Sequence, residues 1–162
     1  EARQYAEMAE KYHAAAEPAE QAAPAELVIS QSWSGDYPVA KLSRLPEGQQ
    51  QSPTGYLGNA VEFSSVWAAF RPGESPPAVD FDKQVVVFHR NVNFYNRTRI
   101  FKVTLRDRVA EILAMETLSA IPITDRVAMA MAVIPRAGVK FIQAGAVRIP
   151  VRVDKRNRQD QE

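Results

Sequence analysis

Short strand-like runs separated by turns fill the chain from residue 83 to residue 153, and they restrict its fold more than any other feature. The runs 83–90, 100–106, 108–116 and 126–134 are rich in β-branched, aromatic and other apolar residues. Because short connections join strands that run in opposite directions, the pattern predicts antiparallel pairing. There is no internal repeat and no regular alternation of strands with long helices. The predicted fold class is therefore α+β, one domain dominated by an antiparallel β-sheet.

The run 126–134 alternates between large and small apolar residues. Val127, Met129, Met131 and Val133 fall on one face of a strand and alanines fall on the other, because successive side chains point to opposite faces. Methionine fills irregular gaps in cores. We therefore expect both faces of this strand to be tightly packed.

One short helix is predicted over residues 61–70, where Val66 and Trp67 lie near helical spacing with their apolar neighbours. Asn59 is a candidate N-cap, and Pro72 with the glycine after it would stop the helix. We expect this helix to pack Trp67 into the core.

The chain before this helix is less regular. Residues 27–30 predict a strand, whereas Gly35, Asp36 and Pro38 predict a turn. Residues 43–60 are rich in Pro, Gly, Gln and Ser and predict a long loop.

Residues 1–26 differ from the rest, with six Glu against Arg3 and Lys11, a local charge of −4. Ala and Glu favour a helix, and Pro18 requires this helix to end before it. The sequence predicts a helix over about residues 2–16 and then an extended spacer. The expected organisation is a tail and linker at 1–26, a β-rich domain at 27–153 and a polar tail at 154–162.

Tyr5, Met8 and Tyr12 recur at the spacing of one helical stripe. This stripe predicts a docking helix that lies against a partner protein. The alternative is that it packs on this chain's own body or frays, since an isolated helix of this length is marginal in water.

Composition excludes several kinds of chemistry. The 20 Lys and Arg nearly balance the 19 Asp and Glu, so the net charge of +1 provides no overall field for nucleic acid. The chain has no cysteine and only two histidines, His13 and His89. It also lacks a Gly-rich phosphate loop, H-E-x-x-H and G-x-S-x-G. We therefore predict a protein that is not an enzyme and needs no cofactor of its own.

The segment from Arg90 to Arg108 is the most distinctive candidate surface, and the sequence predicts it to be a basic hairpin. It holds six Lys and Arg against Asp107 alone, a local charge of +5. Arginine and aromatic side chains often anchor protein interfaces, so we expect an acidic protein partner. A purely solvated face is the alternative, and nucleic acid fits least. The expected anchors are Arg90, Phe94, Tyr95, Arg97 and Arg99.

Two other functions stay open. Soft methionine sulfur with a histidine suits Cu(I), so His89 with Met129 and Met131 could make a metal or small-ligand carrier. Alternatively, the chain completes a cofactor site on another subunit by offering one histidine.

The chain begins with Glu1 rather than Met, so we expect a processed chain or a fragment, with a removed signal peptide as the obvious processing event. Absence of cysteine is compatible with export. We expect a periplasmic or extracellular location, and no apolar run approaches the ~20 residues that cross a bilayer.

The chain resembles the PrcB C-terminal-like domain over residues 60–143. The resemblance lies in EFSSVWAAF at 62–70, PPAVDFDKQVVVF at 76–88 and MAVIPRAGVKF at 131–141. It implies a small extracytoplasmic β-rich domain that associates with other proteins, including a role alongside a surface protease. The Gly-rich turn of that family has no counterpart at 89–101, so none of its contacts is carried over. The combined hypothesis is an exported accessory protein that binds other subunits through its N-terminal helix and the basic segment.

Overall fold

The structure is a computed structural model that describes residues 23–152. Its helices are the 3-10 helix η1 (Val39–Arg44) and the α-helix α2 (Ala60–Phe70). Its strands are β1 (Ala25–Glu26), β2 (Gln31–Pro38), β3 (Thr54–Leu57), β4 (Gln84–Arg90), β5 (Thr98–Arg106), β6 (Val109–Glu116), β7 (Arg126–Pro135), β8 (Phe141–Ala144) and β9 (Val147–Pro150).

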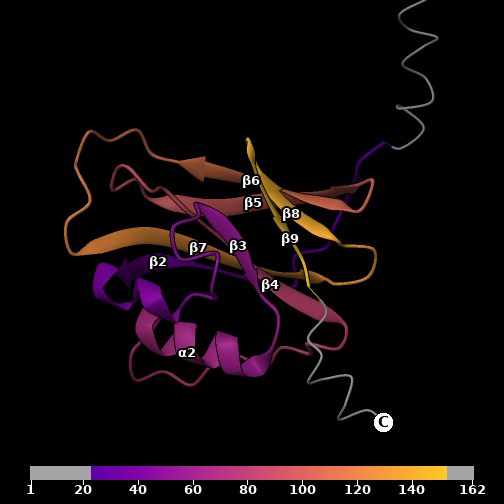
Figure 1. Cartoon of the computed structure of the whole chain (residues 1–162), viewed down its shortest axis with the longest axis horizontal. Coiled ribbons are helices and arrows are strands. Elements are labelled where there is room, and N and C mark those ends of the chain that lie inside the picture. Colours follow the sequence, from indigo (N-terminus) through magenta and orange to yellow (C-terminus); the bar gives the residue numbers. More distant parts are fainter. Residues whose placement is uncertain (1–22, 153–162) are drawn as a thin grey trace, which may run out of the picture.

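Two sheets and one α-helix form three layers (Figure 1). One sheet has the order β2-β7-β4-β3 and the other has the order β1-β5-β6-β8-β9. Neighbouring strands are antiparallel except β6 and β8, which are parallel. Parallel neighbours need a crossover connection, and here the crossover contains β7, which belongs to the other sheet. The predicted α+β class is confirmed in its coarse form, with two antiparallel-rich sheets in place of one.

Strand β7 is the centre of the middle layer and is buried along nearly its whole length. Met129 and Met131 pack with α2 in one core, whereas Ala130 and Ala132 face the five-stranded sheet in a second core. The predicted alternation is thereby confirmed. The small alanines leave room for the second sheet, and the methionines fill the space below the helix.

Helix α2 forms as the sequence predicts. The Asn59 side chain accepts a hydrogen bond from the backbone N–H of Glu62 at 2.8 Å, which caps the helix. Trp67 lies in the core beside Trp33, with ring centroids 5.2 Å apart and nearly perpendicular. Such edge contacts between aromatic rings are favourable.

The turn predicted at residues 35–38 is wrong, because these residues belong to β2. Gly35 pairs with Met129 in a continuous register, and a Cβ at this glycine would lie 3.2 Å from Cζ of Phe70. The absence of a side chain at Gly35 therefore lets α2 pack closely on the sheet. The strand predicted at 27–30 is also displaced, since these residues cross from β1 to β2.

The long loop predicted over residues 43–60 contains the edge strand β3, which pairs with β4. Gly55 sits tightly in β3, because an added Cβ would clash with Oε1 of Gln49 and lie 2.6 Å from Cζ of Phe88. That same Gln49 oxygen accepts the backbone N–H of Tyr56 at 2.7 Å.

The predicted hairpin from Arg90 to Arg108 is wrong, because β4 and β5 belong to different sheets. Residues 91–97 cross from one sheet to the other. The true hairpin joins β5 to β6. Its turn places Asp107 and Arg108 at φ angles of 52° and 67°, as two-residue hairpin turns with both central residues at positive φ do.

The expected helix over 2–16, including Tyr5, Met8 and Tyr12, and the tail 154–162 lie outside the described residues. Ala25–Glu26 pair with β5, so the sheet already begins before the expected domain start at residue 27. No helix in the described part of the chain is long and apolar enough to cross a membrane.

Gly55→Ala should lower the free energy of unfolding by about 3 kcal/mol, since the new methyl group overpacks Phe88 and displaces Gln49 from a buried N–H. Denaturant unfolding would measure the change. Gly58→Ala is the matched control, because its new Cβ meets chiefly the ends of the Arg136 and Tyr56 side chains. Equal losses in both variants would contradict this account of β3.

Candidate functional site

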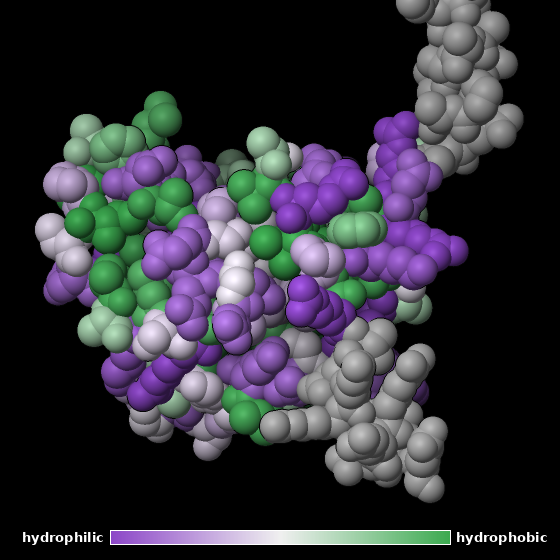
Figure 2. Space-filling model, in the orientation of Figure 1, coloured by the Kyte–Doolittle hydropathy of each residue, from purple (hydrophilic) through white to green (hydrophobic). Residues whose placement is uncertain are grey.

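Exposed apolar side chains gather at one end of the two sheets. Eight large apolar side chains are exposed among residues 23–152, and all but Val28 and Val61 lie in the β4–β5 loop, the β6–β7 loop or the adjoining parts of β5 and β6. Figure 2 shows apolar surface at its left-hand side, where Figure 1 places the loops between β4 and β5 and between β6 and β7. We call this surface the loop-end patch. Its members are Val92, Phe94, Phe101, Met115, Leu118 and Ile121.

The two loops that carry most of the patch are hydrogen-bonded to each other. Tyr95 donates its backbone N–H to the carbonyl oxygen of Ile121 at 2.9 Å, and Phe94 pairs with Pro122 in an isolated β-bridge. Further along, the backbone N–H of Thr117 donates to the carbonyl oxygen of Arg97 at 3.0 Å. These contacts hold the apolar side chains of both loops in one surface.

Glu116 fixes the start of the loop between β4 and β5. Its carboxylate bonds Nε2 of His89 at 2.9 Å and accepts a hydrogen bond from Nδ2 of Asn91 at 3.0 Å. Oδ1 of Asn91 in turn accepts the backbone N–H groups of Asn93 at 2.8 Å and Phe94 at 2.7 Å. This Asx turn sets the direction of the chain at Phe94, whose side chain is 44% exposed.

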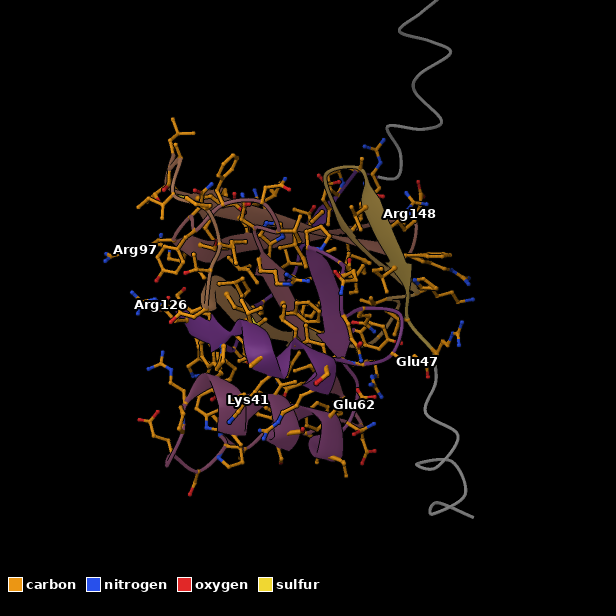
Figure 3. The ribbon with its side chains drawn as sticks, turned by 60° about the vertical axis from the view of Figure 1, so that its left-hand side comes forward. Lys41, Glu47, Glu62, Arg97, Arg126 and Arg148 are labelled. Atoms are coloured by element: carbon orange, nitrogen blue, oxygen red, sulfur yellow. The ribbon has the colours of Figure 1, made fainter. Side chains whose placement is uncertain are left out.

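Cationic side chains border the patch. Arg97 and Arg99 are exposed, and Figure 3 shows Arg97 and Arg126 at the same end of the molecule. Arg126 donates to Oδ2 of Asp36 at 3.2 Å and lies over the Tyr95 ring, 5.3 Å from its centroid. The Tyr95 hydroxyl donates to Oδ1 of the same Asp36, and this hydrogen bond is the main cause that raises the pKa of Tyr95. The loop is thereby tied to β2.

A hollow of about 270 Å³ lies beside these charged groups, between β2 and the start of β5. It opens next to the patch and shares Tyr95 and Arg97 with its border. Both signs of charge are present, from Asp36 and Arg97. Its lining is Ser34, Gly35, Asp36, Tyr95, Arg97, Thr98 and Ala128.

Four of the predicted contact residues lie together at this end: Phe94, Tyr95, Arg97 and Arg99. Arg90 does not join them, which corrects the sequence prediction. It is 4% exposed, and its Nη2 donates to the carbonyl oxygen of Gln50 at 2.8 Å. Burial lowers the pKa of its guanidinium. Arg90 therefore joins β4 to the loop before β3 and does not face a partner.

The sequence analysis missed most of the patch. Leu118 is 101% exposed and Ile121 is 63% exposed, yet neither is among the predicted contact residues. The available signal was the presence of two large apolar residues shortly before Pro122, in the loop between β6 and β7. Phe101 and Met115 lie in β5 and β6. They are exposed because one face of the five-stranded sheet is uncovered there, which the sequence does not show.

The residues considered for a carrier do not come together. His89 points toward Glu116 in the five-stranded sheet, whereas Met129 and Met131 pack toward α2 on the opposite face. Within residues 23–152, no group of three or more His, Asp or Glu side chains is placed to hold a metal ion.

A larger hollow, of about 500 Å³, lies near Glu47 and Glu62 (Figure 3). The Glu62 carboxylate accepts the backbone N–H of Gly58 at 2.9 Å, so it supports the start of α2. The lining contains neither histidine nor serine. A Ser–His pair is therefore absent from this lining, whereas Glu47 and Glu62 are two carboxylate residues in it.

Glu116→Ala should loosen the loop between β4 and β5, since His89 and Asn91 both lose their hydrogen bond to the carboxylate. We expect faster amide hydrogen exchange across residues 91–97 and about 1 kcal/mol less stability. Exchange followed by mass spectrometry would measure this. Glu111→Ala, on the same strand, is the control; the same exchange pattern in both variants would show that Glu116 does not hold the loop.

No family model matches this chain, and neither a curated protein nor a solved structure matches it. The resemblance to the PrcB C-terminal-like domain therefore stays a prediction. The geometry offers a surface suited to binding.

Proposed function

We propose that this protein is a non-enzymatic accessory subunit that binds another protein through the loop-end patch. The observation that carries the proposal is the gathering of six exposed apolar side chains at one end of the described fold. Large exposed apolar patches on folded domains mark interaction surfaces, because covering them removes apolar area from water.

The composition of the patch supports a protein partner. Phe94, Phe101 and Met115 are residue types enriched at the centres of protein interfaces, and arginine is enriched with them. The hydrogen bonds between the two loops reduce the ordering cost of binding, since the surface is formed in advance.

The border of the patch sets the chemistry of the partner. Arg97 and Arg99 are exposed beside it, so an acidic protein surface with apolar side chains at its centre fits best. Nucleic acid fits poorly, because the patch itself is apolar and the whole chain carries a net charge of only +1.

Two parts of the proposal come from the sequence alone. The stripe of Tyr5, Met8 and Tyr12 would provide a second contact with a partner, and the chain would act after export to the periplasm or the extracellular space. Both are supported by composition and spacing. We rank the metal carrier lower, because His89 and the methionines of β7 face opposite sides of a sheet.

Phe94→Ser combined with Leu118→Ser should reduce capture of the native partner at least about tenfold, since a hot-spot side chain contributes about 2 kcal/mol or more. Both side chains are exposed, so the melting temperature should change little. A native pull-down with cross-linking and mass spectrometry would measure both the amount captured and the contact site. Cross-links should involve Lys102 more than Lys83, which precedes the opposite end of β4.

Val61→Ser is the matched control, because Val61 is 77% exposed on α2, away from the patch. It should leave capture unchanged. Equal capture by the patch variant and the control variant would refute the proposed site.

A further inference from the structure

We propose that residues 1–16 of one copy of this chain bind the loop-end patch of the next copy, head to tail. The inference rests on the proposed function, because it names one occupant of the same patch. Two features support it: the chemistry of the two surfaces and the direction in which the chain enters β1.

The two surfaces are complementary in charge and in apolar content. Arg97 and Arg99 are exposed beside the patch, whereas residues 1–22 carry five Glu against Arg3 and Lys11. Opposite charges of this kind steer partners together and favour this orientation over others.

The N-terminal sequence also has apolar anchors to offer. Tyr5, Met8 and Tyr12 would share one face of a helix. Such a helix is too short to be stable alone in water, so burying this face against Phe94 and Leu118 of another copy would offset its ordering cost.

The chain enters β1 from the side opposite to its own patch. Ala25 pairs with Leu105 near the end of β5, whereas the patch lies at the beginning of β5, where Arg99 pairs with Met115. Strand β1 runs antiparallel to β5, so the chain approaches Ala25 from the side of Leu105 and not from the side of the patch. Figure 1 shows the first described residues at the opposite end from the two loops.

Binding within one molecule would require the chain to turn back on itself. Leu105 and Arg99 are six residues apart on β5, which corresponds to about 20 Å. To reach its own patch, the chain before residue 23 would have to reverse direction and return over this length. The patch of a following copy requires no reversal.

A donor segment at one end and an acceptor patch at the other make a heterologous contact. Contacts of this type join copies into open chains or rings, whereas a self-complementary contact stops at a dimer. The assembly should therefore grow with concentration.

The test uses two full-length variants. Tyr5→Ser, Met8→Ser and Tyr12→Ser together remove the donor, and Phe94→Ser with Leu118→Ser remove the acceptor. Sedimentation velocity over about a hundredfold range of concentration should show the unchanged chain growing in size and each variant monomeric. An equimolar mixture of the two variants should stop at a dimer. The intact donor of one variant binds the intact patch of the other, and the donor and patch that remain unbound are the altered ones.

Charge provides a second readout. Raising the salt concentration from about 0.1 M to about 0.5 M should weaken the growth. Arg97→Glu with Arg99→Glu should abolish it, whereas the control pair Lys83→Glu with Lys140→Glu should not. Lys83 and Lys140 are exposed and lie outside the patch.

Three results would overturn the inference: a chain that stays monomeric at every concentration, a dimer that does not grow, or a mixture of variants that does not associate. If the unchanged chain stays monomeric and the donor variant still captures a different protein through the patch, self-assembly is wrong and the proposed function stands. Loss of both self-assembly and patch-dependent capture would remove the proposed function as well.

Discussion

The burial of β7 on both faces is the constraint on which the rest of the structure depends. A strand in the middle layer must satisfy two cores at once, and this one does so by alternating Met129 and Met131 with Ala130 and Ala132. The larger side chains fill the space below α2, and the alanines let the five-stranded sheet pack closely. Strands β2 and β4 pair with β7, β3 pairs with β4, and the five-stranded sheet packs against the sheet that contains β7.

The same arrangement creates the patch. The chain changes sheets after β4 and again after β6, and both crossings occur at one end of the layers (Figure 1). There the loops bond to each other through Tyr95 and Ile121, but no described element covers their outer side. Apolar side chains such as Leu118 are thus left exposed as a direct result of the topology.

Local patterns in the sequence predicted the helix and the central strand, whereas the division into two sheets could not be read from them. Asn59 and the alternation around Met129 act locally, and both predictions are confirmed. A loop such as 91–97 looks the same whether it joins paired strands or crosses between sheets, so the predicted hairpin was wrong and Arg90 was misplaced. Gly35 suggested a turn because glycine is common in turns. Its actual role, to make room for Phe70, depends on a tertiary contact that the local sequence does not show.

The parallel pairing of β6 with β8 has a consequence for how the chain folds. These strands are joined by residues 117–140, which pass through the other sheet as β7. Their contact is therefore non-local, and loop closure must be completed before the pairing contributes any stability. The edge formed by β8 and β9 should be among the last parts to form, and the folding rate should be slow for a chain of this size.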